Sequence, residues 1–265
     1  MTTLSTPDLL ATIVAATRTA VAVRERQQPS ASLPARPARA AGAEAFLDAV
    51  RSSGTPRIIA ECKRRSPSRG ILRPQYDPAA HAASYAAGGA AAISVLTEPT
   101  FFDGALSHLA AVRGAVSIPV LRKEFVVADY QVHESAALGA DAILLIVAAL
   151  GDADLRRLHT LASSLGLAVL VEVHAAGELE RALASGARIV GVNSRNLRTL
   201  EVDLAVVEQL AGMVPDDVVA VAESGIRTGA DIRRFSSLGY DAFLVGERLI
   251  PQADPGAALT ELRAS

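Results

Sequence analysis

The sequence predicts an α/β fold, a (β/α)8 TIM barrel with one extra helix at its N-terminus. From residue 58 onward, short β-branched runs alternate with alanine- and leucine-rich helical patterns. This alternation is typical of parallel strands that are covered by helices. Eight such units follow one another in about 210 residues, and eight is the number that closes this barrel.

The eight expected strands are almost continuously apolar, as strands buried on both faces should be. They occupy residues 58–62, 92–97, 119–125, 142–147, 168–173, 188–193, 218–223 and 242–246. Helical patterns lie between them, for example at residues 153–165, 176–185, 204–213 and 229–238. An open doubly wound sheet is the alternative, but the count of eight and the absence of a G-x-G-x-x-G turn favour the barrel.

The N-terminal part of the chain precedes the barrel repeat. Residues 8–27 form an amphipathic pattern with Asp8 as the expected N-cap, and the proline- and alanine-rich segment 29–42 predicts a surface connection. We therefore expect a single domain, residues 1–265, in which residues 1–45 form the N-terminal helix and connection and residues 58–265 form the barrel. The helix is expected to cover one end of the barrel as a lid or plug.

Composition excludes several classes of partner. With 28 acidic and 26 basic residues the formal net charge is −2, which argues against a broad cationic surface for nucleic acid. The first 20 residues lack the apolar stretch of a secretion signal, and no segment has the composition of a membrane span, so a cytoplasmic protein is expected. The single cysteine, Cys62, excludes a disulfide framework and is expected to face the helix layer.

No metal site is expected, because the histidines show no ligand spacing. Four of the five fall in expected helices, and all are interpreted as surface or helix-packing residues: His81, His108, His133, His159 and His174.

Lysine and asparagine are rare in this chain. Only Lys63 and Lys123 are lysines, and only Asn193 and Asn196 are asparagines. Biased codon usage accounts for the depletion but not for the positions that remain. Arginine replaces lysine poorly where an ammonium must give up a proton, because a guanidinium stays charged. Both lysines lie at predicted strand ends, which indicates proton chemistry there.

The carboxyl ends of the strands meet at one mouth of such a barrel, where catalytic residues of this fold are found. A single charged residue at a strand end is usually only solvated, but here six ends carry polar groups or glycine. Desolvation and mutual interaction are expected to move the pKa values of lysines and glutamates there toward neutrality, which suits acid–base catalysis. The ends are Glu61-Cys62-Lys63, Arg122-Lys123-Glu124, Glu172, Asn193, Glu223-Ser224-Gly225 and Gly246-Glu247.

Phosphate has an expected position at the same mouth. Gly225 and Gly246 follow the last two strands and permit close backbone approach, where barrels of this fold often bind phosphate. The loop 63–70, KRRSPSRG, is basic and rich in hydroxyl groups. Together these features predict a phosphorylated small-molecule substrate.

At this point the chain resembles the indole-3-glycerol phosphate synthase family. The matching segments fall in order on seven of the eight strands, and the extra N-terminal helix also suits the family. The resemblance implies ring closure of 1-(2-carboxyphenylamino)-1-deoxyribulose 5-phosphate with loss of CO2 and water, and no metal or organic cofactor. The segments are IIAECKRRSPSRG, ISVLTEPTFFDG, PVLRKEF, VLVEVH, GVNSRNL, AESGI and LVGE.

The resemblance also implies residue roles. Lys123 would be the general acid at the ribulose carbonyl, Glu172 and Glu61 the carboxylates of later proton steps, and Lys63 a substrate contact that could donate a proton. Polar positioning is implied for Asn193 and Ser224, phosphate binding for Ser66, Gly225, Gly246 and Glu247, and contact with the substrate carboxylate for Arg195. The aryl pocket is expected from Phe102, Phe125, Leu145 and Leu197.

Two arginines depart from the family pattern. Arg65 and Arg248 stand where smaller residues are expected, beside the predicted phosphate site. Phosphate affinity is therefore the property that these two arginines are expected to change. Two alternatives stay open, a related phosphoribosyl aldose–ketose isomerase and a catalytically silent paralogue. The lysine pair argues against the first, and the intact set of strand-end residues argues against the second. An association with other enzymes of the tryptophan pathway is left open.

Overall fold

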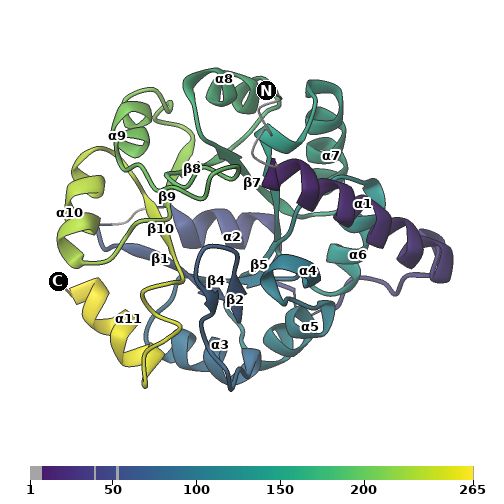
Figure 1. The fold of residues 1–265 in the computed structure, drawn as a ribbon, viewed down its shortest axis with the longest axis horizontal. Coiled ribbons are helices and arrows are strands. Elements are labelled where there is room, and N and C mark those ends of the chain that lie inside the picture. Colours follow the sequence, from purple (N-terminus) through teal and green to yellow (C-terminus); the bar gives the residue numbers. More distant parts are fainter. Residues whose placement is uncertain (1–7, 39, 52–53, 265) are drawn as a thin grey trace, which may run out of the picture.

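The computed structural model describes residues 8–38, 40–51 and 54–264, and the first seven residues of the expected segment 1–45 lie outside this range. Eight parallel strands close into a barrel with the order β1-β10-β9-β8-β7-β6-β5-β4 (Figure 1), which confirms the predicted fold. Each strand begins and ends within two residues of its predicted bounds. The strands are β1 (Arg57–Cys62), β4 (Ala92–Leu96), β5 (Val120–Lys123), β6 (Ala142–Ile146), β7 (Ala168–Val173), β8 (Ile189–Asn193), β9 (Val219–Glu223) and β10 (Ala242–Val245).

Helices surround the strands as an outer ring in Figure 1. The helices that follow the barrel strands are α3 (Pro78–Ala87), α4 (Pro99–Phe102), α5 (Leu106–Ala115), α6 (Asp129–Ala137), α7 (Asp152–Ser164), α8 (Ala176–Ala184), α9 (Ala205–Ala211), α10 (Gly229–Ser237) and α11 (Pro255–Ala264). The described part of the chain also contains the short 3-10 helices η1 (Ser30–Ser32) and η2 (Val147–Ala149). Among the described residues, no helix is long and apolar enough to cross a membrane.

Side chains alternate between two apolar layers along each strand. In β6, Ala142, Leu144 and Ile146 fill the inside of the barrel, whereas Ile143 and Leu145 pack against the surrounding helices. Cys62 likewise belongs to the outer layer, as predicted. Because successive residues of a strand point to opposite faces, the last inward residue of each strand reaches the mouth.

The N-terminal helix α1 (Leu9–Gln27) lies beside the mouth and crosses the front of the barrel in Figure 1. Asp8 caps it as predicted, accepting a hydrogen bond from the Ala11 N–H at 3.1 Å. Near its other end, Arg24 donates to both carboxylate oxygens of Glu134 on α6, at 2.8 and 3.1 Å. Glu134 in turn accepts from the fully buried Arg122 at 2.9 Å, so α1 is tied through α6 to β5.

A second N-terminal helix, α2 (Ala43–Val50), closes the opposite end of the barrel and was not predicted. Its Phe46, Leu47 and Val50 are buried against residues near the starts of strands, such as Ile59 and Ala92. No side chain among the residues that the structure describes caps this helix, which begins after Gly42 in a left-handed conformation (φ 94°). It has eight residues and follows a proline-rich segment, so no start signal marks it in the sequence.

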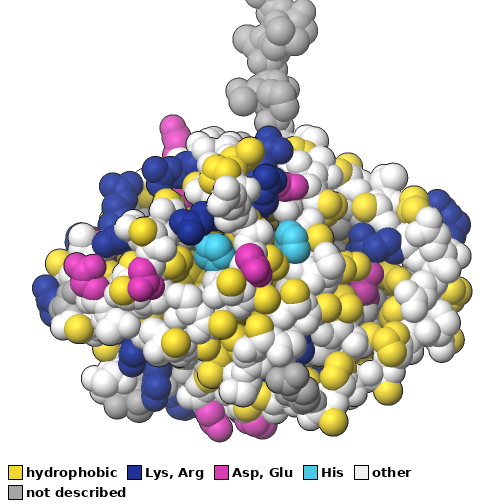
Figure 2. All heavy atoms as spheres, turned by 90° about the horizontal axis from the view of Figure 1, so that it is seen from below, with side chains coloured by type: hydrophobic (Ala, Val, Ile, Leu, Met, Phe, Trp, Pro, Cys, Tyr) yellow, Lys and Arg dark blue, Asp and Glu magenta, His cyan; other side chains and the backbone are white. Residues whose placement is uncertain are grey.

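The loop after β1 folds into a small hairpin of β2 (Arg65–Ser66) and β3 (Gly70–Ile71), which was also not predicted. The hairpin buries Ser66 at the mouth, while Arg65, its neighbour in the strand, is exposed. On the face shown in Figure 2, basic and acidic side chains are interspersed among apolar and neutral ones.

Replacing Phe46 by alanine should destabilise the protein by about 3–5 kcal/mol, because a fully buried ring is lost from the floor of the barrel. Urea unfolding followed by far-UV circular dichroism measures the change. Met213→Ala, at a position with 46% of the residue exposed, is the control and should change stability by no more than about 0.5 kcal/mol. Equal effects of the two substitutions would contradict the role of α2 as a buried floor.

Candidate active site

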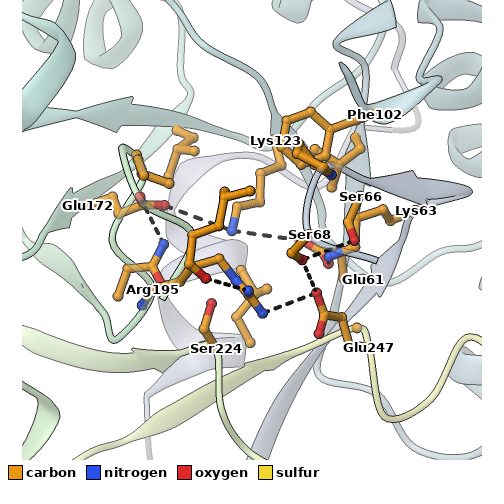
Figure 3. A pocket seen from close by; sticks show the side chains of 18 of the residues that line it. Glu61, Lys63, Ser66, Ser68, Phe102, Lys123, Glu172, Arg195, Ser224 and Glu247 are labelled. Atoms are coloured by element: carbon orange, nitrogen blue, oxygen red, sulfur yellow. Dashed lines mark hydrogen bonds and ion pairs between the residues drawn. The ribbon is translucent and has the colours of Figure 1, made fainter. Parts of the chain in front are cut away.

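A cavity opens at the carboxyl ends of the strands, with about 980 Å³ of empty space including its entrance (Figure 3). Strand ends, the hairpin after β1 and the start of α1 all contribute to it. The structure brings together every predicted site residue except Leu145. Those lining the cavity are Glu61, Lys63, Ser66, Phe102, Lys123, Phe125, Glu172, Asn193, Arg195, Leu197, Ser224, Gly225, Gly246 and Glu247.

The Lys123 ammonium lies among three carboxylates that come from three other strands. Its Nζ is 2.7 Å from Glu223 Oε2, 3.7 Å from Glu61 Oε1 and 3.8 Å from Glu172 Oε2. All four side chains are largely buried, with Lys123 the most exposed at 14%. Figure 3 shows Lys123 pointing into the space between Glu172 and Glu61.

This arrangement corrects the expectation that the pKa of Lys123 moves toward neutrality. Burial alone would lower it, but Glu223, Glu61 and Glu172 together outweigh burial and raise the pKa of Lys123 above its ordinary value. Several opposite charges within about 4 Å favour the charged form more than desolvation disfavours it. Lys123 is therefore held as an ammonium, poised to donate a proton only to a strongly basic atom.

Glu223 is the carboxyl group of the site whose pKa lies near neutrality. Burial raises the pKa of Glu223 to about 7, with Lys123 opposing the shift and Glu172 adding to it. Its Oε2 accepts from Lys123, while its buried Oε1 has no hydrogen-bond partner among the described residues. The sequence placed Glu223 at a strand end but assigned only the following Ser224 and Gly225 to the site. The inward alternation of β9 was the signal that could have found it.

Glu61 and Lys63 form an ion pair at the end of β1, as their shared strand face suggests. Burial opposes the charged form of Glu61, yet the lysines Lys63 and Lys123 hold its pKa below the ordinary value. A side chain at Gly246, on the neighbouring strand end, would overlap the Glu61 carboxylate. Gly246 therefore leaves room for Glu61, in addition to any approach of a ligand to the backbone.

Asn193 orients the carboxylate of Glu172. Its Nδ2 donates to Glu172 Oε1 at 3.0 Å, and its Oδ1 accepts from the Arg195 N–H at 2.9 Å. The other oxygen of Glu172 is left facing Lys123. Ser224, at the end of β9, has a left-handed backbone (φ 65°) and also lines the cavity.

The histidines follow the prediction with one exception. Four of them lie in helices, namely His81 in α3, His108 in α5, His133 in α6 and His159 in α7. His174 instead follows β7, and its Nε2 is 3.4 Å from Glu172 Oε1. The interpretation of His174 as a surface or packing residue overlooked this approach to Glu172, which its position two residues further along the chain indicates.

An apolar wall lies on one side of the cavity. The rings of Phe102 and Phe125 have centroids 6.1 Å apart, and Leu197 lies in the same wall with Leu9 and Ile13 of α1. The prediction that Leu145 lies in this pocket was wrong. Its side chain points outward into the helix layer, and its strand neighbours Leu144 and Ile146 line the cavity instead. The prediction was off by one residue on β6, and a shift of one residue along a strand moves a side chain to the opposite face.

Glycine and hydroxyl groups lie on the other side. Gly225 has a left-handed backbone (φ 73°), and a side chain there would overlap Leu204. Arg195 Nη2 donates to Glu247 Oε1 at 3.1 Å, and Ser68 of the hairpin lies 3.4 Å from the same oxygen. Figure 3 shows these contacts, which join the β1 loop and the segment after β8 to the β10 end.

The two departing arginines behave differently. Arg248 lines the cavity and donates from Nε to the Arg227 carbonyl oxygen at 3.3 Å. Arg65 does not line the cavity, because it is on the exposed side of the hairpin, opposite the buried Ser66. Of the two, only Arg248 lies at the cavity.

Comparison with known proteins identifies the same family that the motifs suggest. The family model described as indole-3-glycerol phosphate synthase matches residues 10–262. A Beutenbergia cavernae protein named indole-3-glycerol phosphate synthase is 49% identical over 257 residues, covering 97% of this chain and 95% of its own length. One of the same name from a Nocardioides species is 52% identical over 250 residues, covering 94% of this chain and 96% of its own length.

Solved structures with lower identity share the fold. A 3-hexulose-6-phosphate synthase has a TM-score of 0.62 at 18% identity, covering 78% of this chain and 98% of its own. Thiamine phosphate pyrophosphorylase from Pyrococcus furiosus has a TM-score of 0.61 at 19% identity, covering 78% of this chain and 94% of its own. At this level of identity the likeness concerns the barrel alone.

The carboxyl group of Glu223 should titrate near pH 7, because it is buried next to another carboxylate and only partly compensated by Lys123. NMR of protein labelled with ¹³C at the glutamate side-chain carboxyl carbon measures this directly. A resonance that moves near neutrality and disappears in Glu223→Gln is expected. A Glu223 resonance that titrates below pH 5 would contradict the assignment.

Proposed function

The chain belongs to the indole-3-glycerol phosphate synthase family, and we propose that its barrel mouth performs this reaction with residues of its own in defined roles. The substrate is 1-(2-carboxyphenylamino)-1-deoxyribulose 5-phosphate, and ring closure releases CO2 and water, which makes the enzyme a carboxy-lyase. The observation that carries the proposal is the Lys123 ammonium, held by three carboxylates at the floor of a half-apolar cavity. A silent paralogue would have no reason to keep so much buried charge in one place.

Two ends of the cavity suit two ends of the substrate. The phosphate would bind at Gly225, Gly246, Glu247 and Ser66, where backbone approach is close. The aromatic ring would pack on Phe102, Phe125 and Leu197, with its carboxylate near Arg195. Holding both ends brings the aryl carbon and the ketone together, which is worth several kcal/mol in barrier height when the geometry is near attack.

Lys123 would act in the first step. As the aryl carbon that bears the carboxylate attacks the ketone, negative charge develops on the ketone oxygen. An alkoxide is more basic than an amine, so an ammonium with a raised pKa can first stabilise this charge and then donate its proton. Loss of CO2 then restores the aromatic ring.

Dehydration needs one acid and one base. The tertiary hydroxyl leaves as water after it takes a proton, for which Lys63 is the candidate donor. The adjacent carbon loses a proton to a carboxylate, with Glu172 and Glu61 as candidates. Glu172 is the better placed, because Asn193 fixes one oxygen and leaves the other open toward the cavity.

The proposal also places the enzyme in the cytoplasm, because its substrate carries a phosphate and a carboxylate and would not cross a membrane unaided. Association with other enzymes of the tryptophan pathway stays a prediction.

The activity should appear as indole fluorescence. The chain has no tryptophan, so its own emission comes only from tyrosine and phenylalanine. Incubation with the anilino-deoxyribulose phosphate should give indole emission that grows with time in proportion to enzyme concentration. Tight binding without such growth would instead identify a silent paralogue.

Lys123→Arg should lower kcat by about 10²–10⁴-fold, the usual contribution of a general acid. The substitution keeps the positive charge but removes the proton that can be donated. Binding of inorganic phosphate should be retained, which separates this loss from unfolding. A kcat within a few-fold of the parent would exclude Lys123 as the acid.

Gly191→Ala should also impair turnover, by roughly 10²-fold. Gly191 lies on β8 next to β9, and a Cβ there would overlap the Glu223 carboxylate and push it away from Lys123. The matched control is Gly114→Ala in α5, where the added carbon meets nothing within 4 Å. If both variants keep parental turnover, the Lys123–Glu223 contact is not needed for catalysis.

A further inference from the structure

His174 lies between two carboxylates at the edge of the mouth. Its Nε2 is 3.4 Å from Glu172 Oε1, and its Nδ1 is 3.4 Å from Glu178 Oε2 on α8. The His174 backbone N–H donates to the same Glu178 oxygen at 2.7 Å, which fixes that oxygen beside the ring. The imidazole therefore joins a carboxylate of the site to a carboxylate outside it.

Exposure rises along this series of side chains. Glu172 is 2% exposed, His174 16% and Glu178 23%. Toward the interior, the series continues from Glu172 to Lys123, from Lys123 to Glu61 and from Glu61 to Lys63. Titratable side chains thus follow one another from solvent to both lysines, with separations of up to 3.8 Å between neighbours.

The charges around His174 favour the imidazolium. Burial opposes that form, but Glu178 on α8, Glu172 on β7 and Glu223 on β9 outweigh burial and raise the pKa of His174 above its ordinary value. The Lys123 ammonium approaches the opposite oxygen of Glu172, and Arg181 acts on Glu178 from the same helix. The buried Nε2 has no hydrogen-bond partner among the described residues, and a small movement toward Glu172 Oε1 would form one.

The proposed reaction consumes one proton from solvent in every turnover. A carboxylate of this kind is ionised at neutral pH and leaves as neutral CO2. The ketone oxygen takes one proton, the departing hydroxyl takes a second, and the adjacent carbon returns one. The enzyme is therefore one proton short after each cycle, while substrate or product fills the mouth.

We propose that His174 supplies this proton to Glu172 and that Glu178 is the group that aims the ring. The inference rests on the proposed function. When Glu172 has passed the proton that it took from carbon to the neutral Lys123 amine, its Oε1 takes the proton from His174 Nε2, and the N–H electron pair stays on nitrogen. Transfer from Glu172 to Lys123, from Lys123 to Glu61 and from Glu61 to the neutral Lys63 amine then restores the starting charges. The neutral ring keeps its proton at Nδ1, toward Glu178, and regains one at Nε2 from solvent. His174 is thus a positioning residue that acts through Glu172 and does not touch the substrate.

The test compares kcat of the parent and of His174→Gln as a function of pH. Below the raised pKa of His174 the parent should be faster by about 10²-fold, and the ratio of the two kcat values should shrink as pH rises through that pKa, since the imidazolium is lost. The KM should change little. A constant ratio across pH would mean that His174 is only structural and would overturn the proposal.

Chemical rescue gives a second readout. In His174→Ala, added imidazole should restore kcat in proportion to its protonated fraction, because it can occupy the vacated, partly exposed position. The control is His159→Ala in α7, a half-buried histidine away from the mouth, for which kcat, its pH profile and the imidazole response should match the parent. No response of His174→Ala to imidazole, together with a constant pH ratio, refutes the relay.

Glu178→Gln keeps the test decisive if neither His174 variant folds. Loss of one carboxylate should lower the pKa of His174, measured by NMR of protein labelled with ¹⁵N-histidine, and the fall in kcat should move to lower pH with it. An unmoved pKa would overturn the proposal. The NMR measurement does not require turnover, so an inactive parent refutes the proposed function while the geometry around His174 is still tested.

Discussion

The charge balance of one buried cluster determines how the mouth is built. Two ammonium groups, Lys63 and Lys123, lie with three carboxylates, Glu61, Glu172 and Glu223. If all five were ionised the cluster would carry one surplus negative charge away from bulk water, which is unfavourable. Glu223 relieves this surplus, because its pKa is raised to about 7 and the group is therefore protonated part of the time near neutral pH. Such a cluster titrates as a unit rather than as separate residues.

The outside of the barrel supports this cluster from behind. Arg122 and Lys123 are neighbours on β5 and point to opposite faces, so the outer residue controls the strand that carries the inner one. Arg122 donates to Thr97, Ser135, Glu134 and the Gln131 carbonyl oxygen, all between 2.9 and 3.1 Å. Glu134 extends the network to Arg24 of α1, the helix whose other end walls the cavity with Leu9 and Ile13. One network of hydrogen bonds and ion pairs thus joins the strand that carries the lysine to the helix that forms part of the apolar wall.

The sequence predicts the barrel well because apolar strands and helices alternate through most of the chain. The helix α2 and the β1 hairpin escape prediction because both are short and carry no start signal. Within the site, motif position identifies the residues that line the cavity but not their mutual effects.

Leu145 was misplaced because a sequence match does not specify strand register to one residue. The direction of the Lys123 pKa shift depends on how many carboxylates lie near its ammonium group. These carboxylates come from three other strands, so the sequence of one strand does not predict the shift. Glu223 and His174 were missed for related reasons, since their partners come from other strands.

The rarity of lysine has a practical consequence for handling the protein. Both lysine side chains of the chain are at least 86% buried within the mouth. Reagents that couple to lysine amines, such as succinimidyl esters used for dyes or solid supports, therefore find no lysine on the outer surface. Any lysine that does react lies in the mouth, and its modification would be felt there first. Attachment through introduced cysteines is the better route, because the one native thiol, Cys62, is buried in the helix layer.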